Sequence, residues 1–261
     1  MPFLALGLVV SCSSSKKRSV TDPYATEDKF CTEWAKAACN SSVVEKCSGD
    51  TANATTTAAC QSSQKTYCLG LIPLNYASDN AKGCVTAVGK AYADAKLTSE
   101  ELGLLRKPLV APCDELNEGP QTVGGSCYSN DECNSLDGLR CVIPIAKSGG
   151  TCQVPVEVGG GLTCSGVDQV CAKGFYCDGS HCIAKKSGGE SCDVDMPCSE
   201  DFQCLGATGN LACQAKSENG GTCTADEQCK SSICAIAGTG NGTCVPSVIL
   251  APTEPMCTHL R

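Results

Sequence analysis

Cysteine dominates the chemistry open to this chain, which has 25 Cys among its 261 residues. Thiols at this density either pair as disulfides or bind metal ions as thiolates. Metal sites of this kind commonly use Cys-x2-Cys pairs or His partners, but no two Cys here are separated by two residues, and the chain has only 2 His. The sequence therefore predicts disulfides formed outside the reducing cytoplasm, and neither a metal nor another cofactor.

Few side chains are candidates for catalysis. His181 stands between Ser180 and Cys182 in a short inter-cysteine loop, and His259 stands near the C-terminus. A Cys nucleophile needs a free thiol of low pKa, which paired Cys do not offer. The Gly-Gly pairs of the chain precede Cys rather than helices, so they do not read as phosphate-binding loops. We therefore expect no enzyme.

The balance of charge argues against nucleic acid as a partner. The formal net charge is −8, and residues 113–261 carry 8 basic and 18 acidic side chains. Binding to phosphates needs clustered Lys and Arg. We expect instead an extracellular protein or polysaccharide as ligand, recognised through an acidic face of the second half of the chain.

The first residues have the character of a targeting segment. Residues 1–11 are mostly apolar and fit the short core of a signal peptide. Their ending, Val9-Val10-Ser11-Cys12, resembles a bacterial lipobox. The resemblance implies lipidation of Cys12 and a lipid-anchored tether over residues 12–25, in an envelope protein held at the membrane, most simply the outer membrane, by its N-terminal lipid. Ordinary secretion without lipid is the alternative.

Residues 26–112 show the apolar periodicity of helices rather than strands. Phe30 and Trp34 lie on one helical face that Thr26 can cap, and Thr98 with Glu101 forms a capping-box pattern for a short last helix. A core this small needs cross-links, so we expect a small all-α domain with three bridges among its six Cys. The spacing does not choose among the possible connectivities. These six are Cys31, Cys39, Cys47, Cys60, Cys68 and Cys84.

Residues 113–247 contain four copies of a four-Cys pattern, which we call modules one to four. The first Cys recurs at steps of 37, 28 and 31 residues, as in a repeat array with insertions in surface loops. A Gly-Gly pair precedes each first Cys, and Gly can adopt the turns of positive φ that such junctions need. An apolar residue two positions before the third Cys recurs in three modules as Leu139, Phe175 and Phe202, whereas the fourth has Ser232 there and Ile233 next to it. The sequence predicts tandem modules of short β-hairpins and loops held by disulfides.

Four Cys allow three pairings in each module. We expect the interleaved pairing, first to third and second to fourth, because side-by-side pairing would leave two separate small loops and no compact unit. The expected bridges are Cys127 with Cys141, Cys133 with Cys152, Cys164 with Cys177, Cys171 with Cys182, Cys192 with Cys204, Cys198 with Cys213, Cys223 with Cys234, and Cys229 with Cys244.

Two Cys lie outside both sets. We expect Cys113 to pair with Cys257, which would tie the end of the array to the domain junction, and we expect residues 248–261 to form an irregular tail because they are rich in Pro.

An acidic residue stands two or three positions before the second Cys of every module. These residues are Asp131, Asp168, Asp195 and Asp226. An Asp at such a place commonly closes a turn onto its own backbone. Calcium binding is the weaker alternative, because calcium takes about six to eight oxygen ligands and one Asp in a module supplies too few.

The spacing of the modules, Gly-x-x-Cys-x5-Cys-x5-Cys, resembles the Dickkopf N-terminal cysteine-rich type of module. The resemblance covers residues 124–244 and rests mostly on Cys and Gly. It implies a disulfide-rich module that also occurs in tandem in bacterial envelope proteins behind a lipobox. The adjacent Cys-Cys pair of the animal proteins is missing here, so receptor antagonism is not implied.

Together these features predict a secreted, lipid-anchored surface protein with a binding or structural role in recognition or adhesion. The alternative is a protease-inhibitor-like protein that acts through an inter-cysteine loop such as 142–151 or 235–243. Binding that weakens with salt would favour the first function, and tight inhibition independent of salt would favour the second.

Overall fold

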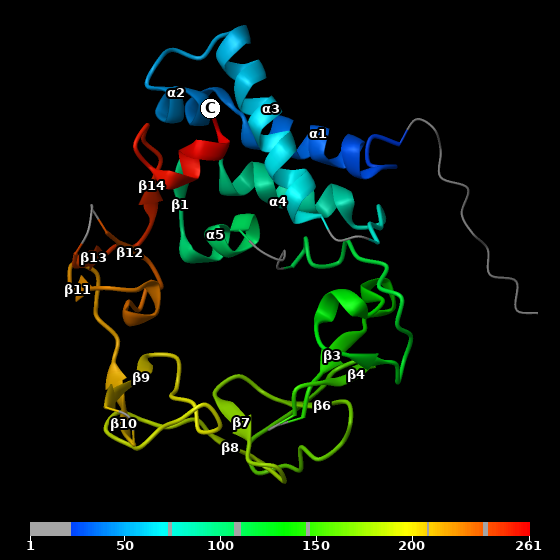
Figure 1. The fold of residues 1–261 in the computed structure, drawn as a ribbon, viewed down its shortest axis with the longest axis vertical. Coiled ribbons are helices and arrows are strands. Elements are labelled where there is room, and N and C mark those ends of the chain that lie inside the picture. The colour runs from blue at the N-terminus through cyan, green and yellow to red at the C-terminus, as the bar shows by residue number, and fades with distance from the viewer. Residues whose placement is uncertain (1–21, 73–74, 107–110, 145–146, 208, 237–239) are drawn as a thin grey trace, which may run out of the picture.

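A computed structural model describes residues 22–72, 75–106, 111–144, 147–207, 209–236 and 240–261. The predicted signal peptide at 1–11, the lipidation site Cys12 and the tether up to residue 21 lie outside the described residues. The fold is a small helical part followed by disulfide-rich modules with very short strands (Figure 1).

The described part of the chain has five α-helices, all in its N-terminal portion, as predicted. They are α1 (Glu27–Ala38), α2 (Ser41–Ser48), α3 (Ala54–Leu71), α4 (Ala81–Ala91) and α5 (Ser99–Arg106). The predicted caps are present: the Thr26 side chain accepts from the backbone N–H of Lys29, and Thr98 and Glu101 exchange reciprocal hydrogen bonds. The sequence analysis missed α2, which begins after the N-cap Asn40 and ends at Gly49 with positive φ.

The strands of the described residues form six small sheets rather than one. They are β1 (Lys96–Leu97), β2 (Ser126–Cys127), β3 (Arg140–Val142), β4 (Gly150–Gln153), β5 (Val156–Val158), β6 (Gln169–Cys171), β7 (Phe175–Cys177), β8 (Cys182–Ala184), β9 (Phe202–Ala207), β10 (Asn210–Ala215), β11 (Thr222–Cys223), β12 (Cys234–Ala235), β13 (Gly242–Cys244) and β14 (Val248–Ile249). Modules one and four have three-stranded sheets, β2-β4-β3 and β11-β13-β12, whereas modules two and three are built on the hairpins β7–β8 and β9–β10. Strand β5, which lies between the last Cys of module one and the first Cys of module two, runs parallel to β6.

The main apolar core lies in the helical part and is completed by the end of the chain. Phe30, Trp34 and Tyr92 are fully buried there. The same cluster contains Leu250 and Leu260 from the C-terminal segment. The prediction of an irregular tail over 248–261 is therefore wrong, because this segment forms β14 and the 3-10 helix η4 (Pro255–His259) and buries its apolar side chains against the helices.

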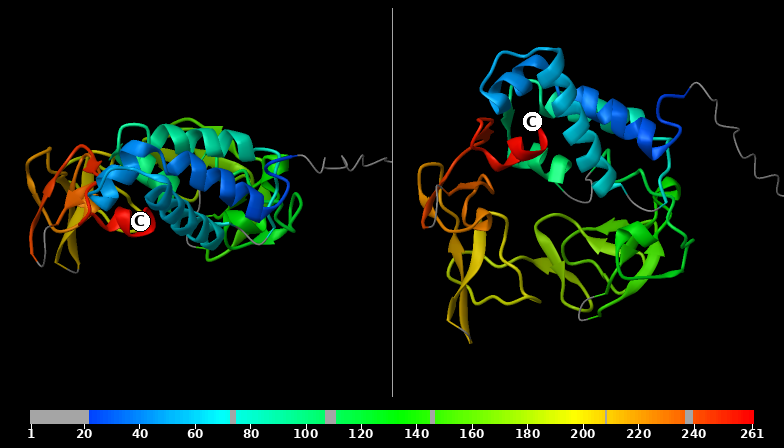
Figure 2. Two further views of the ribbon diagram at one scale, coloured as in Figure 1. Left: turned by 90° about the horizontal axis from the view of Figure 1, so that it is seen from above. Right: turned by 45° about the horizontal axis from the view of Figure 1, so that its top comes forward.

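The chain closes into a ring. The four modules follow one another from the end of the helical part, and the C-terminal segment returns to the same helices (Figure 1). Strand β14 pairs antiparallel with β1, and the Gln64 side chain donates to the carbonyl of His259 at 2.7 Å. Both views of Figure 2 place the C-terminal segment beside the helices. Both ends of the module array are thus attached to one helical domain.

Two disulfides mark the two attachments and correct the expected pairing of Cys113. Cys84 pairs with Cys113 at the start of the array, and Cys47 pairs with Cys257 across 210 residues at its end. The predicted bridge between Cys113 and Cys257 is wrong, because each of these Cys lies buried against a different helix of the domain.

The expectation of three bridges among the six helical Cys is also corrected. Only two are internal, Cys31–Cys68 and Cys39–Cys60, and both join α1 or its C-cap to α3. The remaining two helical Cys bind the array instead. The six-Cys set is therefore not self-contained, and the helical domain is cross-linked to both ends of the chain that follows it.

We predict that breaking the Cys47–Cys257 bridge opens the ring. In the chain-entropy account a bridge across about 100 residues contributes about 4.7 kcal/mol and one across about 15 residues about 3 kcal/mol. The Cys47→Ala/Cys257→Ala variant should therefore lose about 4 kcal/mol or more in urea denaturation, and its radius of gyration in X-ray scattering should rise.

The matched control is Cys198→Ala/Cys213→Ala, which removes a bridge of sequence separation 15 within one module. It should lose less stability and keep the radius of gyration of the parent. Unchanged scattering for the Cys47→Ala/Cys257→Ala variant would contradict the prediction that this bridge is needed to keep the ring closed.

Candidate functional site

Each module is organised around a cluster of sulfur atoms. The third Cys stands directly opposite the fourth in the strand register, as Cys141 opposite Cys152 and Cys177 opposite Cys182, and the other two modules repeat this. Neither bonds to its neighbour, because the third is joined to the first Cys and the fourth to the second. All eight bridges therefore have the interleaved pairing that the sequence analysis favoured.

Three sulfurs of each module lie within 4.8 Å of one another. Free thiolates at such spacing would suit a soft metal ion. All 24 Cys of the described residues are in disulfides, and a disulfide sulfur does not offer a thiolate. These clusters are thus covalent cross-links that take the place of an apolar core.

A repeated pair of backbone hydrogen bonds attaches the Gly-Gly turn to the fourth Cys. One Gly of each turn has φ between +78° and +93°. Its N–H donates to the carbonyl of the fourth Cys, and the N–H of that Cys donates back to the carbonyl of the next residue, at 2.7–2.9 Å. The glycines concerned are Gly124, Gly161, Gly189 and Gly220. The requirement for positive φ explains why Gly recurs there.

An apolar residue lies two positions before the third Cys in three modules, and module four has its counterpart one position before. We call these residues the plugs of the modules; they are Leu139, Phe175, Phe202 and Ile233. Leu139 is fully buried within the first module. A Cβ at Gly160 or Gly188 would collide with the ring of Phe175 or Phe202, so these glycines let the turn close on the aromatic plug. In module four Ile233 is 3% exposed but belongs to the core cluster of the helical domain. Module four therefore uses its plug to dock on the helices.

The four recurring Asp residues do not share one role. Asp226 accepts the backbone N–H of Cys234 through Oδ1 at 2.7 Å, as expected for a residue that closes a turn. Asp131 and Asp168 contribute their backbone carbonyls, to Asn117 and Val156. Asp195 donates its N–H to the side chain of Asp193, which is the residue that closes that turn.

The structural counterpart of Asp226 in module one is Asn130. Each stands three residues after the first Cys and begins a 3-10 helix, η3 (Asp226–Gln228) or η1 (Asn130–Glu132). Asn130 Oδ1 accepts the N–H of Cys141 at 2.9 Å. Counting from the first Cys rather than selecting acidic residues would have found this position. Since an amide serves as well as a carboxylate, the repeated role is hydrogen bonding.

The geometry does not gather the Asp candidates into a calcium site. Among the residues that the structure describes, the only groups of three potential ligand atoms close enough to hold an ion are the Cys clusters. The weaker alternative for Asp131, Asp168, Asp195 and Asp226 thus has no cluster of oxygen ligands behind it.

The two His have local structural contacts. His181 donates its backbone N–H to Asp178 Oδ1 at 2.8 Å, and this bond with that of Ser180 holds the pKa of the Asp178 carboxyl below its ordinary value. His259 stacks on Tyr67 with ring centroids 4.3 Å apart. One His stabilises a module loop, and the other helps to seat the C-terminal segment.

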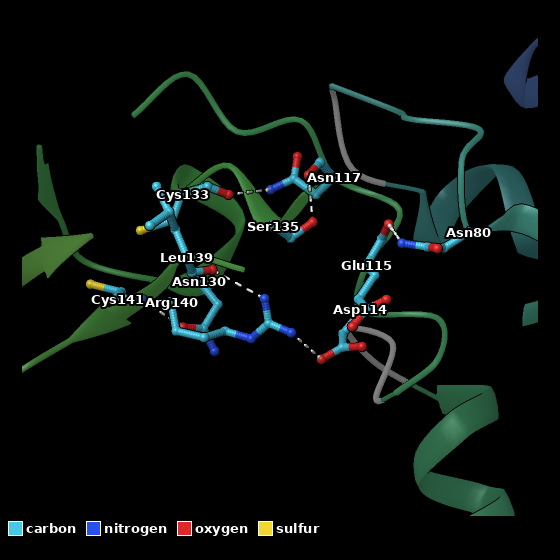
Figure 3. A network of polar contacts seen from close by, with 10 residues as sticks. All are labelled: Asn80, Asp114, Glu115, Asn117, Asn130, Cys133, Ser135, Leu139, Arg140 and Cys141. Carbon is cyan, nitrogen blue, oxygen red and sulfur yellow. Dashed lines mark hydrogen bonds and ion pairs between the residues drawn. The ribbon is translucent and has the colours of Figure 1, made fainter. Parts of the chain in front are cut away.

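A polar network fixes module one on the end of the helical domain (Figure 3). Arg140 donates to Asp114 at 3.1 Å, and the buried Asn117 donates to the carbonyl of Cys133. The hydroxyl of Ser135 donates to the carbonyl of Asn117 at 2.5 Å. Because Asp114 and Asn117 follow Cys113 closely in the chain, the network and the Cys84–Cys113 bridge act at the same junction.

A groove of about 760 Å³ lies at the other junction, between module four and the helical domain. Strands β12 and β14 and the helix α5 line it, and its apolar surface comes from residues such as Ile236, Val248 and Ile249. Of the described residues that line it, Asp226 and Glu254 are charged. The volume falls within the range of about 300–1,000 Å³ that is usual for ligand sites. No feature of the sequence pattern pointed to this groove, because it depends on ring closure.

Comparison with known proteins found no matching family model, no matching curated protein and no matching solved structure. The function must therefore be argued from the chain's own residues. The module surfaces and the groove beside module four offer the most specific geometry for that argument.

We predict that Asp226 can be replaced by Asn but not by Ala. Asp226→Asn keeps an acceptor for the Cys234 N–H, as Asn130 does in module one, whereas Asp226→Ala leaves that N–H without a partner, at a cost of about 1–3 kcal/mol. Amide hydrogen exchange at Cys234 should become about tenfold faster or more in Asp226→Ala and change little in Asp226→Asn.

Asn130→Ala provides the matched test in module one, where exchange at Cys141 should accelerate to a similar extent. Equal exchange rates in the Ala and Asn variants at residue 226 would show that the side-chain oxygen is not the acceptor.

Proposed function

We propose that the protein is a secreted, lipid-anchored cell-surface protein whose module ring serves recognition or adhesion, and that it is not an enzyme. The observation that carries the proposal is the attachment of both ends of the module array to one helical domain. A closed ring holds the modules at fixed relative positions, and a surface that is ordered before binding loses less entropy when a partner binds.

The chemistry of the array supports a cationic partner. Residues 113–261 carry an excess of acidic over basic side chains of 18 to 8. Among the described residues, ion pairs in this region are seen at Asp114, Glu200 and Glu218. The net charge of the region, 8 − 18 = −10, favours proteins with basic surfaces and disfavours nucleic acids.

The disulfide network is characteristic of proteins outside the reducing cytoplasm. Within the described residues no helix combines the length and the apolarity that a membrane span requires. Attachment at the envelope is therefore proposed on the lipobox-like residues that end at Cys12, which the described residues do not include.

The inhibitor alternative rests on loops that the structure describes only in part. Residues 145–146 of the loop 142–151 and residues 237–239 of the loop 235–243 lie outside the described residues. No observation on the described parts of these loops favours a reactive bond, so recognition is the function we propose.

We predict that Cys12 determines attachment to the membrane. The unchanged chain should fractionate with membranes and yield an N-terminal peptide with the mass of a lipidated Cys, because several acyl chains together give stable anchoring. Cys12→Ser should move the protein to the soluble fraction, with the twelve disulfides unaltered in non-reducing peptide maps. Soluble behaviour of both forms would support ordinary secretion.

We also predict that the ring binds envelope components through its negative charge. The oxidised Cys12→Ser chain should be retained by intact envelopes of the producing cells at about 50 mM salt and released at about 500 mM, because screening weakens exposed ionic contacts. The reduced and alkylated chain is the control and should not be retained. Absence of retention would contradict recognition at the envelope, and tight inhibition of a protease that persists in high salt would support the alternative.

A further inference from the structure

Sulfur atoms gather in the modules in a way that they do not in the helical domain. In every module three sulfurs that belong to two different bridges lie within 4.8 Å of one another. The four bridges of the helical domain and its attachments stand singly: among the described residues, none of their eight Cys belongs to a group of three such ligand atoms. Only the modules therefore bring two bridges, and so four Cys, to one place.

Module two shows how the backbone places its four Cys, because residues 147–207 are all described. Cys177 of β7 stands opposite Cys182 of β8 in the hairpin. The N–H of Cys164 donates to the carbonyl of Ser180, in the turn of that hairpin, at 2.9 Å. Cys171 ends β6, which pairs with β5 and leads into β7 after three residues. Backbone hydrogen bonds thus help the disulfides to fix where the four side chains begin.

The spacing of the sulfurs suits a tetrahedral zinc site. Four thiolates around Zn²⁺ have Zn–S distances of about 2.3 Å, which puts each pair of sulfurs about 3.8 Å apart. Cys164, Cys171 and Cys182 already have their sulfurs within 4.8 Å of one another, and Cys177 is bonded to Cys164. After reduction the two sulfurs of a bridge only need to separate from about 2 Å to about 3.8 Å. Rotation of the side chains is sufficient for this, with the backbone in place.

We propose that each module binds one Zn²⁺ ion through its four Cys when both of its bridges are reduced, and that the ion keeps the module folded. In module two the ligands are Cys164, Cys171, Cys177 and Cys182. The same four residues thus form two alternative cross-links, a pair of disulfides under oxidising conditions and a metal site under reducing ones. The inference goes beyond the proposed recognition function and does not rest on it.

The reaction needs a reductant and balances in two steps. Each bridge takes two electrons and two protons from one molecule of a dithiol, which becomes a disulfide, and each bridge yields two Cys thiols. The four thiols of one module then release four protons as their thiolates bind Zn²⁺. Both bridges of a module must be reduced, because a remaining disulfide withholds two of the four ligands.

The ion replaces the cross-links of a unit that has little else to hold it. Phe175, the plug of module two, is only half-buried, so its packing does not hold the module without cross-links. A structural zinc site couples metal binding to folding, because the site does not exist in the unfolded chain. We therefore expect a reduced module to be folded with Zn²⁺ and unfolded without it.

The test uses the whole chain with Cys12→Ser under nitrogen, reduced by a phosphine, which takes one oxygen atom from water for each bridge that it reduces. The chain is titrated with Co²⁺, whose absorption spectrum reports tetrahedral sulfur ligands. The reduced chain should take up about four ions, one for each module, and Zn²⁺ should displace them. The oxidised chain should show no such absorption. An unstructured chain that shared its 24 Cys at four to an ion would take up about six.

Variants then locate the sites. Cys164→Ser/Cys177→Ser removes one bridge and two ligands from module two, and the uptake should fall to about three ions. The matched control is Cys31→Ser/Cys68→Ser, which removes one bridge between α1 and α3. It should leave the uptake at about four ions, because no third sulfur stands beside this pair among the described residues.

Alkylation gives a second readout that does not depend on counting ions. In the reduced chain Zn²⁺ should slow the labelling of the module Cys by iodoacetamide about tenfold or more, and a chelator should reverse this. In Cys164→Ser/Cys177→Ser the remaining Cys171 and Cys182 should lose the protection, whereas the four Cys of module three should keep theirs. Peptide mapping assigns each rate to its Cys.

Four results would each overturn the inference. They are absence of the Co²⁺ absorption, uptake of about six ions, an equal loss of ions in both variants, and labelling that Zn²⁺ leaves unchanged. The recognition function is tested on the oxidised chain, so retention by envelopes can be found or refuted whichever of these results is obtained.

Discussion

The structure depends on the return of the C-terminal segment to the helical domain. Leu250, Met256 and Leu260 are part of the same buried cluster as Phe30 and Trp34. The core of the helices is therefore completed by residues that follow the whole module array in the sequence. The indole N–H of Trp34 donates to Gln64, and Gln64 in turn donates to the carbonyl of His259. This buried polar chain ties the core to the last residues. Apolar burial, hydrogen bonding and the Cys47–Cys257 bridge all act on one closure, which is why the array has no free end.

The modules satisfy a different constraint, because they are too small to bury a core of their own. In module four the residues of the local cluster are all Cys, because Ile233 packs in the core of the helical domain instead. Two interleaved bridges and the reciprocal hydrogen bonds of the Gly-Gly turn nevertheless recur in all four modules. Loop lengths between the Cys can therefore vary without changing these contacts, as the unequal repeat steps of the sequence indicate.

The features that could be predicted from the sequence are those whose interacting residues lie close together along the chain. Helix caps such as Thr26, the Gly-Gly turns and the interleaved bridges act over short stretches, so their residue types and spacing reveal them. The partners of Cys47, Cys84, Cys113 and Cys257 depend on where distant segments meet, and the even number of Cys in the helical region, six, permits a wrong assignment. Asn130 was missed for another reason: selecting acidic residues hid a position whose role is to accept a hydrogen bond. The groove could not be predicted at all, since it brings Leu102 of α5 beside Asp226 of module four, 226 − 102 = 124 residues later in the sequence.

The position of the apolar residue in module four links ring closure to the groove. In modules one and two a residue with positive φ, Gly138 or Gly174, precedes the plug, and in module four Ser232 takes that conformation one position nearer the third Cys. The plug Ile233 is thereby available to the helical core instead of the module's interior. Docking through Ile233 brings the edge of β12 to face β14, and the space between them is the groove. Because the carboxylate of Asp226 is held by Cys234 at this edge, the residue that shapes the module also supplies charge to the groove. A shift of one position in the repeat thus lets module four pack its apolar residue on the helices and form one wall of the groove.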